Sequence, residues 1–124
     1  MQPELIEKDP ILKQTILFSL LVIGYCEALD FLKKFVINKQ LLRSATSIGA
    51  IAREAQSAES KAGFIHKIKI DAKEADETQY WLTLCKFGVN YPDSKHITDK
   101  LVEVQKILNS ILGTAKRKNI LVIS

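Results

Sequence analysis

One pair of carboxylates at helical spacing in this 124-residue sequence is of a type that suits catalysis. Glu74 and Glu77 stand three residues apart, so on a helix they share a face and could act as acid and base or bind a metal ion. A di-metal helical bundle, however, repeats a Glu-x-x-His motif, and this sequence contains none. We favour a structural interpretation in which the Arg43 guanidinium pairs with both carboxylates across two antiparallel helices.

Histidines, cysteines and small hydroxyl residues form no catalytic pattern either. His66 and His96 each stand beside a lysine, whose charge disfavours the imidazole as a metal ligand, so we interpret both as surface residues. Cys26 and Cys85 lie in apolar helical patterns with no second cysteine nearby, which predicts two core residues. The hydroxyls within residues 44–57 have no base at a supporting position. We therefore predict no enzyme activity, no metal, no cofactor and no small-molecule substrate.

Basic residues carry the remaining chemistry. The formal charge is +4 at pH 7 and the pI is about 9.1, which is compatible with a nucleic-acid partner without requiring one. If the chain forms an up-down helical bundle, cations from four helix ends meet at one pole: Lys33, Lys34, Lys39, Arg43, Lys86, Lys95 and Lys100. Only Asp30, Asp93 and Asp99 oppose them there. Clustered cations attract a phosphate backbone whatever its sequence, so we hypothesise RNA or DNA binding at this pole.

The same lysines show no aromatic residues between them that would serve as stacking platforms for single strands. Binding at the pole is therefore expected to be weak, sensitive to salt and indifferent to sequence.

The elements that position these residues follow from hydrophobic spacing within residues 40–85. Apolar and small residues recur at spacings of four and three in each half of this stretch, which predicts two amphipathic helices. The first seam is Leu41, Ala45, Ile48, Ala52 and Ala55, and the second is Ile65, Ile68, Ala72, Ala75, Leu82 and Cys85. Ser60 between them is suited to cap the second helix. A short turn makes the two helices antiparallel neighbours, with Arg43 opposite Glu77.

The whole chain, residues 1–124, is predicted to be one all-α domain, an up-down-up-down antiparallel four-helix bundle. Its helices span about residues 10–36, 39–58, 61–87 and 95–118. Asp9 and Pro10 favour the first helix start, because Asp9 can cap and Pro10 suits the first helical position. Residues 1–8 are expected to be a polar lead-in. The apolar tail, residues 120–124, could dock on a neighbour or be disordered.

The middle of the first helix is apolar on nearly every side, so one face needs a partner outside a simple bundle. We predict that this face lies in a subunit interface formed by Ile16, Leu17, Phe18, Leu20, Leu21 and Ile23. The longest uncharged run, residues 14–26, is too short for a bilayer, which needs about 20 residues. The polar, acidic start does not resemble a signal peptide. We therefore expect a cytoplasmic protein without membrane contact.

Three segments resemble a known family: LLRSATSIGA at residues 41–50, REAQSAES at 53–60 and FIHKIKIDAKEADETQYWL at 64–82. They are similar to the bacterial four-helix-bundle proteins encoded in intervening sequences of 23S ribosomal RNA genes. The accessory variability protein of diversity-generating retroelements is a relative of that family. The resemblance is strong over the central hairpin and covers the outer helices only by length and pattern.

The resemblance implies a ring-like homo-pentamer, and no activity is established for most of the family. Its retroelement relative is understood to bind nucleic acid and a reverse transcriptase through a basic surface. The chain departs from the family pattern after Ala50, where Ile51 follows directly, and at Gly63, where an acidic residue is common. We therefore expect a non-enzymatic oligomer that binds nucleic acid. The alternative is a protein-interaction or assembly scaffold that does not bind nucleic acid.

Overall fold

Five α-helices make up the computed structural model, which describes residues 1–123 and their side chains as far as residue 117. They are α1 (Pro3–Lys8), α2 (Pro10–Phe31), α3 (Phe35–Ala55), α4 (Lys61–Phe87) and α5 (Lys95–Ile123). No strand occurs within the described residues, so the all-α prediction is confirmed. The short α1 was not predicted. Pro3 at its first position and Glu4 in its first turn favour this helix, and Leu5 packs against the core.

Capping side chains begin two of the long helices. The Asp9 carboxylate accepts a hydrogen bond from the Ile11 amide at 3.0 Å, and Pro10 occupies the first turn of α2. The Ser60 hydroxyl accepts from the Gly63 amide at 3.0 Å at the start of α4. Both caps are as predicted, and both helices begin at the predicted residue.

The turn between α2 and α3 differs from the prediction. α2 ends at Phe31 rather than residue 36, and α3 begins at Phe35 rather than residue 39. The Lys34 amide donates to the Leu29 carbonyl at 2.8 Å and the Lys33 amide to the Asp30 carbonyl at 2.9 Å, a pairing that closes a helix C-terminus. Lys33 adopts a φ of 60° at the position where glycine is usual. The sequence therefore has no glycine to signal that α2 ends here.

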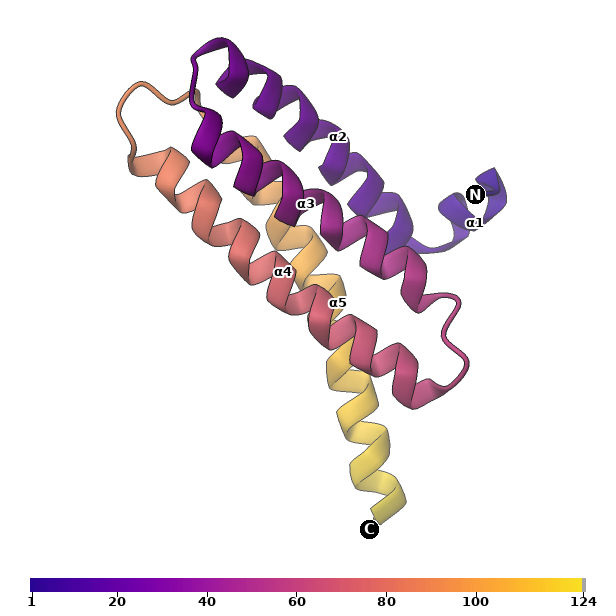
Figure 1. Cartoon of the computed structure of the whole chain (residues 1–124). Helices are drawn as coiled ribbons and strands as arrows, with labels where there is room; N and C mark the ends of the chain where they lie inside the picture. Colours follow the sequence, from indigo (N-terminus) through magenta and orange to yellow (C-terminus); the bar gives the residue numbers. More distant parts are fainter. Residues whose placement is uncertain (124) are drawn as a thin grey trace.

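Two further boundaries move. α3 ends at Ala55, three residues before the predicted end at 58, and α5 continues to Ile123 rather than ending at 118. The backbone of residues 120–123 is therefore helical, whereas their side chains lie outside the described residues. Figure 1 shows the C-terminal part of α5 extending past the other helices.

Each long helix packs against two others. α3 lies against α2 and α4, and α5 lies against the same two helices, while α1 packs on α2. α3 and α4 run antiparallel (Figure 1). A hydrogen bond and an ion pair between them fix their register. Thr78 donates a hydrogen bond to the Ser44 hydroxyl at 2.9 Å, and Lys67 pairs with Glu54 at 3.0 Å.

The core lies along the axis of the four long helices and draws large side chains from each of them. Cys26 and Cys85 are buried in it as free thiols, as predicted. Phe18 corrects the predicted subunit interface, because it is 0% exposed and has no surface left for a partner copy. The largest fully buried side chains are Phe18, Leu12, Leu29, Leu41, Ile48, Ile68, Leu82, Ile97, Leu101, Leu108, Val22 and Val104.

Candidate nucleic-acid interface

Two connections meet at one end of the molecule: the turn between α2 and α3 and the loop between α4 and α5 (Figure 1). The Lys34 ammonium joins them, because it donates to the Val89 carbonyl at 3.2 Å and lies 4.7 Å from the centre of the Tyr91 ring. The Tyr25 hydroxyl donates to the Pro92 carbonyl at 2.8 Å and anchors the same loop to α2. We call this end, residues 31–43 and 86–100, the basic pole.

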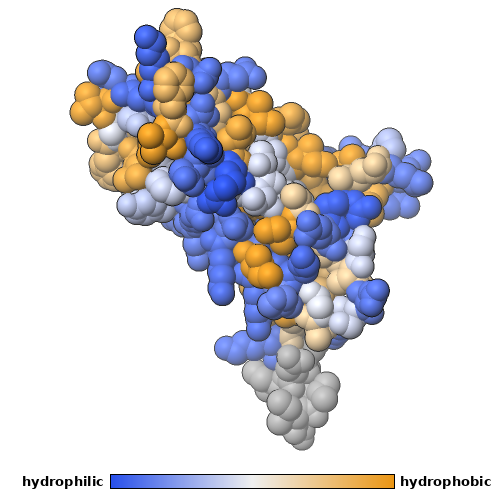
Figure 2. Space-filling view, viewed as in Figure 1, coloured by the Kyte–Doolittle hydropathy of each residue, from blue (hydrophilic) through white to orange (hydrophobic). Residues whose placement is uncertain are grey.

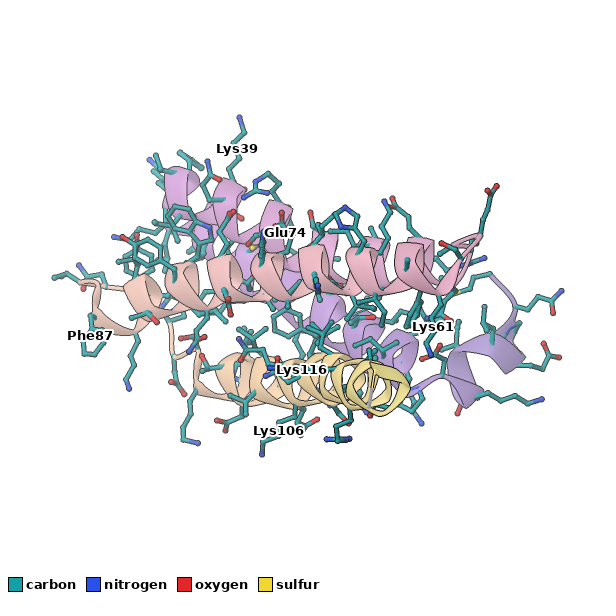
Figure 3. The ribbon with its side chains drawn as sticks, turned by 90° about the horizontal axis from the view of Figure 1, so that it is seen from below. Lys39, Lys61, Glu74, Phe87, Lys106 and Lys116 are labelled. Carbon is teal, nitrogen blue, oxygen red and sulfur yellow. The ribbon has the colours of Figure 1, made fainter. Side chains whose placement is uncertain are left out.

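Three of the seven predicted cations are open to a ligand at the basic pole. Lys33, Lys39 and Lys86 are exposed and form no ion pair within the part of the chain that the structure describes. Figure 3 shows Lys39 projecting outward from α3. Lys34 pairs with no carboxylate within the described residues, and its ammonium donates to the backbone carbonyl of Val89.

The other three predicted cations already have carboxylate partners. Lys95 pairs with Asp99 at 2.9 Å, one turn along α5. Lys100 pairs with Glu103 at 3.0 Å and donates to the Gln14 side-chain oxygen at 2.7 Å. Arg43 pairs with carboxylates of α4. These residues contribute less to an anion-binding field than the sequence pattern indicated, because each charge is locally compensated.

Arg43 joins α3 to α4 where the antiparallel hairpin predicts it. Its Nη2 contacts Glu77 Oε2, and its Nη1 lies 3.6 Å from Glu74 Oε2. The Trp81 indole N–H donates to the same Glu77 oxygen at 2.9 Å. Glu74 and Glu77 are therefore engaged in an interhelical clamp, and this geometry offers no open carboxylate pair for acid–base chemistry.

Exposed aromatic rings stand among the lysines of the basic pole, which corrects the expectation that there are none. Phe31 is 86% exposed, Phe35 57% and Phe87 76%. The Lys86 ammonium lies 5.4 Å from the centre of the Phe87 ring. Figure 2 shows apolar and hydrophilic residues interspersed at this end, and Figure 3 shows Phe87 pointing away from the helices. The alternation of Phe and Lys in FLKKFV at residues 31–36 is the sequence signal that was missed.

A second apolar surface runs along the outer face of α2, away from the basic pole. Leu20 is 61% exposed and is the most exposed residue of the predicted subunit interface. A groove of about 420 Å³ beside it runs between α2 and α3, and its lining includes Leu20, Gly49 and Ala50. Of the predicted interface, Leu17, Leu20, Leu21 and Ile23 are exposed and Ile16 is half-buried.

α2 is also the one helix in the described residues that is long and apolar enough to cross a membrane by length and composition. Part of that apolar character is explained by the core, since Phe18, Val22 and Leu29 of α2 are fully buried. At 22 residues α2 is longer than the uncharged run of residues 14–26, because the helix also includes Lys13, Glu27 and Asp30.

Within residues 1–117, no group of three or more histidine, cysteine, aspartate or glutamate side chains is placed to hold a metal ion. His66 and His96 are exposed, as predicted. Burial raises the pKa of the Cys26 thiol to about 11, which keeps it protonated and unreactive. The Thr46 and Ser47 hydroxyls donate to backbone carbonyls one turn back, each at 2.7 Å, as small hydroxyls on helices commonly do.

Asp71 is a carboxyl group inside the core that sequence reasoning missed. It is 0% exposed, and neither side-chain oxygen has a hydrogen-bond partner within the described residues. Burial, followed by the nearby charge of Glu74, raises the pKa of Asp71 to about 8. The carboxyl is therefore mostly protonated at neutral pH.

Known proteins similar to this chain agree with the helical fold. A family model described as 23S rRNA-intervening sequence protein matches residues 7–110. Among solved structures, the chain is similar to a protein with unknown function from the S23 ribosomal protein family of Bacteroides thetaiotaomicron. The two chains are 38% identical and superpose with a TM-score of 0.77, and the match covers 82% of this chain and 97% of that one. Neither description names an enzyme. No curated protein matches this chain.

Proposed function

Because this chain belongs to the 23S rRNA-intervening sequence protein family, we propose that it is a non-enzymatic, self-assembling protein that binds nucleic acid at the basic pole. The observation that carries this function is a set of three exposed lysines that have no carboxylate partner among the described side chains: Lys33, Lys39 and Lys86. Lysine ammonium groups are point charges that contact phosphates without reading bases, so the proposed binding is indifferent to sequence.

Assembly is the second part of the proposal, and the outer face of α2 supports it. Four leucine and isoleucine side chains stay exposed there beside an apolar groove, which is typical of a surface that another chain covers. We propose that up-down-up-down bundles associate through this face as a cytoplasmic homo-pentamer, the number that the family resemblance implies. Five copies would present five basic poles and strengthen the field that a polyanion meets.

Charge reversal at the basic pole tests nucleic-acid binding. The triple variant Lys33→Glu, Lys39→Glu and Lys86→Glu should lower the affinity for a fluorescent RNA oligonucleotide at least about tenfold, measured by anisotropy over a salt series. The slope of log affinity against log salt should become shallower by about two to three, because three phosphate contacts are lost.

The matched control reverses three exposed lysines outside the basic pole, Lys61→Glu, Lys69→Glu and Lys106→Glu, and so changes the net charge equally. We expect it to retain most of the affinity. Equal losses in both variants would contradict binding at this pole. An assembled wild-type protein that binds no RNA even at low salt would instead support the scaffold alternative.

A further inference from the structure

Three of the five phenylalanines in this chain lie exposed at the basic pole. Leaving a phenylalanine in water forgoes a large favourable burial term, and three such rings in one region indicate a surface that contacts a ligand. Phe31 and Phe35 flank the α2–α3 turn, and Phe87 ends α4 beside the second connection. The contact between Lys34 and the Val89 carbonyl brings these two connections together.

Lysines stand next to these rings. Lys33 stands between Phe31 and Phe35 in the turn, and the Lys86 ammonium lies over the Phe87 ring at 5.4 Å from its centre. A single nucleic-acid strand alternates phosphates with bases whose flat faces are accessible, so it can use both kinds of group. A duplex keeps its base faces stacked inside and offers the rings almost nothing.

We infer that the basic pole prefers single-stranded nucleic acid and holds it by stacking unpaired bases on Phe31, Phe35 and Phe87 between the phosphate contacts of the lysines. This inference rests on the proposed nucleic-acid binding and adds its substrate class. Stacking accepts every base, because each base has an aromatic face, so the preference is for strandedness and leaves binding indifferent to sequence.

Two other occupants fit this surface less well. A second copy meeting it pole to pole would bring Lys33, Lys39 and Lys86 against the same positive charges, which is repulsive. A bilayer would place rings in the hydrocarbon boundary and ammonium groups among the headgroups above them. Lys86 instead lies against the face of Phe87, so the two groups are not separated by depth.

Anisotropy with one labelled oligonucleotide, alone and annealed to its complement, tests the inference. The oligonucleotide should be longer than about 16 nucleotides, the upper end of common single-strand site sizes. We expect tighter binding of the single strand by the wild-type protein. The double variant Phe31→Ala and Phe87→Ala should lose about tenfold or more of that affinity and change duplex affinity less than about twofold.

Leucine replacements separate stacking from apolar contact. Phe31→Leu with Phe87→Leu keeps apolar surface but removes the aromatic faces, so we expect a loss close to that of the alanine variant. Tyr80→Ala is the control, since this ring is 59% exposed about two turns along α4 from Phe87. It should bind like the wild type.

Each contrary outcome has a distinct meaning. Equal affinity for single strand and duplex, or full binding by the leucine variant, would overturn the stacking inference while leaving the proposed function intact. Absence of binding to either form would overturn the proposed function itself. Co-sedimentation with phosphatidylserine vesicles, lost in the alanine variant but kept in the leucine variant, would replace the single strand by a membrane surface.

Discussion

Lys33 has a backbone φ of 60° in the turn of the basic pole, where a residue with a β-carbon is disfavoured. Its amide and that of Lys34 close the end of α2, so the local structure requires this conformation of whichever residue is present. A lysine at a position that suits glycine lowers the stability of the fold. We attribute its presence here to the proposed phosphate contact. Stability and binding can therefore be separated experimentally at this one residue.

Lys33→Gly should raise the free energy of unfolding by about 0.5–1 kcal/mol, because glycine adopts this conformation without steric cost. The same change should weaken RNA binding through the loss of one phosphate contact. Urea unfolding and anisotropy measure the two effects. Lys33→Ala is the control, because it removes the charge but keeps the β-carbon, and should weaken binding without raising stability. A destabilised Lys33→Gly protein would contradict this account.

Asp71 gives the fold a specific pH dependence. Its pKa is raised to about 8 in the folded protein by burial and by the Glu74 charge, whereas an unfolded aspartate titrates near its ordinary value of about 4. Between these values the folded state binds more protons than the unfolded state. The stability contributed by Asp71 is therefore fully present below about pH 4 and is lost as pH rises towards 8, by about 1.4 kcal/mol per pH unit.

Asp71→Asn should remove this dependence, because the amide does not titrate. Its stability relative to wild type should increase with each pH unit between pH 5 and 8, as measured by urea unfolding at fixed protein concentration. Asp76→Asn is the matched control on an exposed carboxylate of the same helix. Parallel curves for the wild type and Asp71→Asn would show that Asp71 is not protonated in the fold.

Residue-level prediction succeeded where the helix register determined the neighbours. The clamp between Arg43 and Glu77 follows from an antiparallel hairpin that turns at Ser60. The topology alone predicts that the lysines of the basic pole lie together. It does not predict which of them pair with a carboxylate. The pairs of Lys95 with Asp99 and Lys100 with Glu103 depend on rotamers, and helical spacing indicates them only as possibilities.

At the scale of elements, α4 was predicted with correct bounds because a capping serine begins it and Gly88 follows it. The end of α2 was missed because a left-handed lysine ends it, and lysine is otherwise a good helix former. α2 itself has two apolar faces. One face, with Phe18 and Val22, packs in the core. Because the helix is apolar on nearly every side, hydrophobic periodicity does not distinguish this core face from the outer face.

The outer face of α2 predicts a defined effect of one substitution on assembly. Leu20→Glu should leave the helical content of the chain intact, because Leu20 is 61% exposed. A substitution at an exposed position usually lowers the free energy of unfolding by about 0.5 kcal/mol or less. In an assembly it would bury an unpaired carboxylate and dissociate the particle. Light scattering with circular dichroism measures both. Val102→Glu, at an exposed site on α5, is the control, and an unchanged mass for Leu20→Glu would contradict this interface.

At the scale of the whole molecule, the two exposed surfaces have separate roles in this account. In the proposed function, the outer face of α2 would join copies of the chain, and the basic pole at the helix ends would stay open to a polyanion. The outer face of α2 lies away from the basic pole, and the like charges of two poles repel each other. Assembly through α2 is therefore compatible with binding at the pole. Each role can therefore be removed by substitution without removing the other.

The most direct test is the native mass of the wild-type protein by light scattering, with in-line absorbance at 260 and 280 nm, at low and high salt. We predict a particle of several chains, five by family resemblance, that carries nucleic acid at low salt and releases it at high salt while its protein mass stays constant. A single-chain mass with no nucleic acid at either salt concentration would contradict the account.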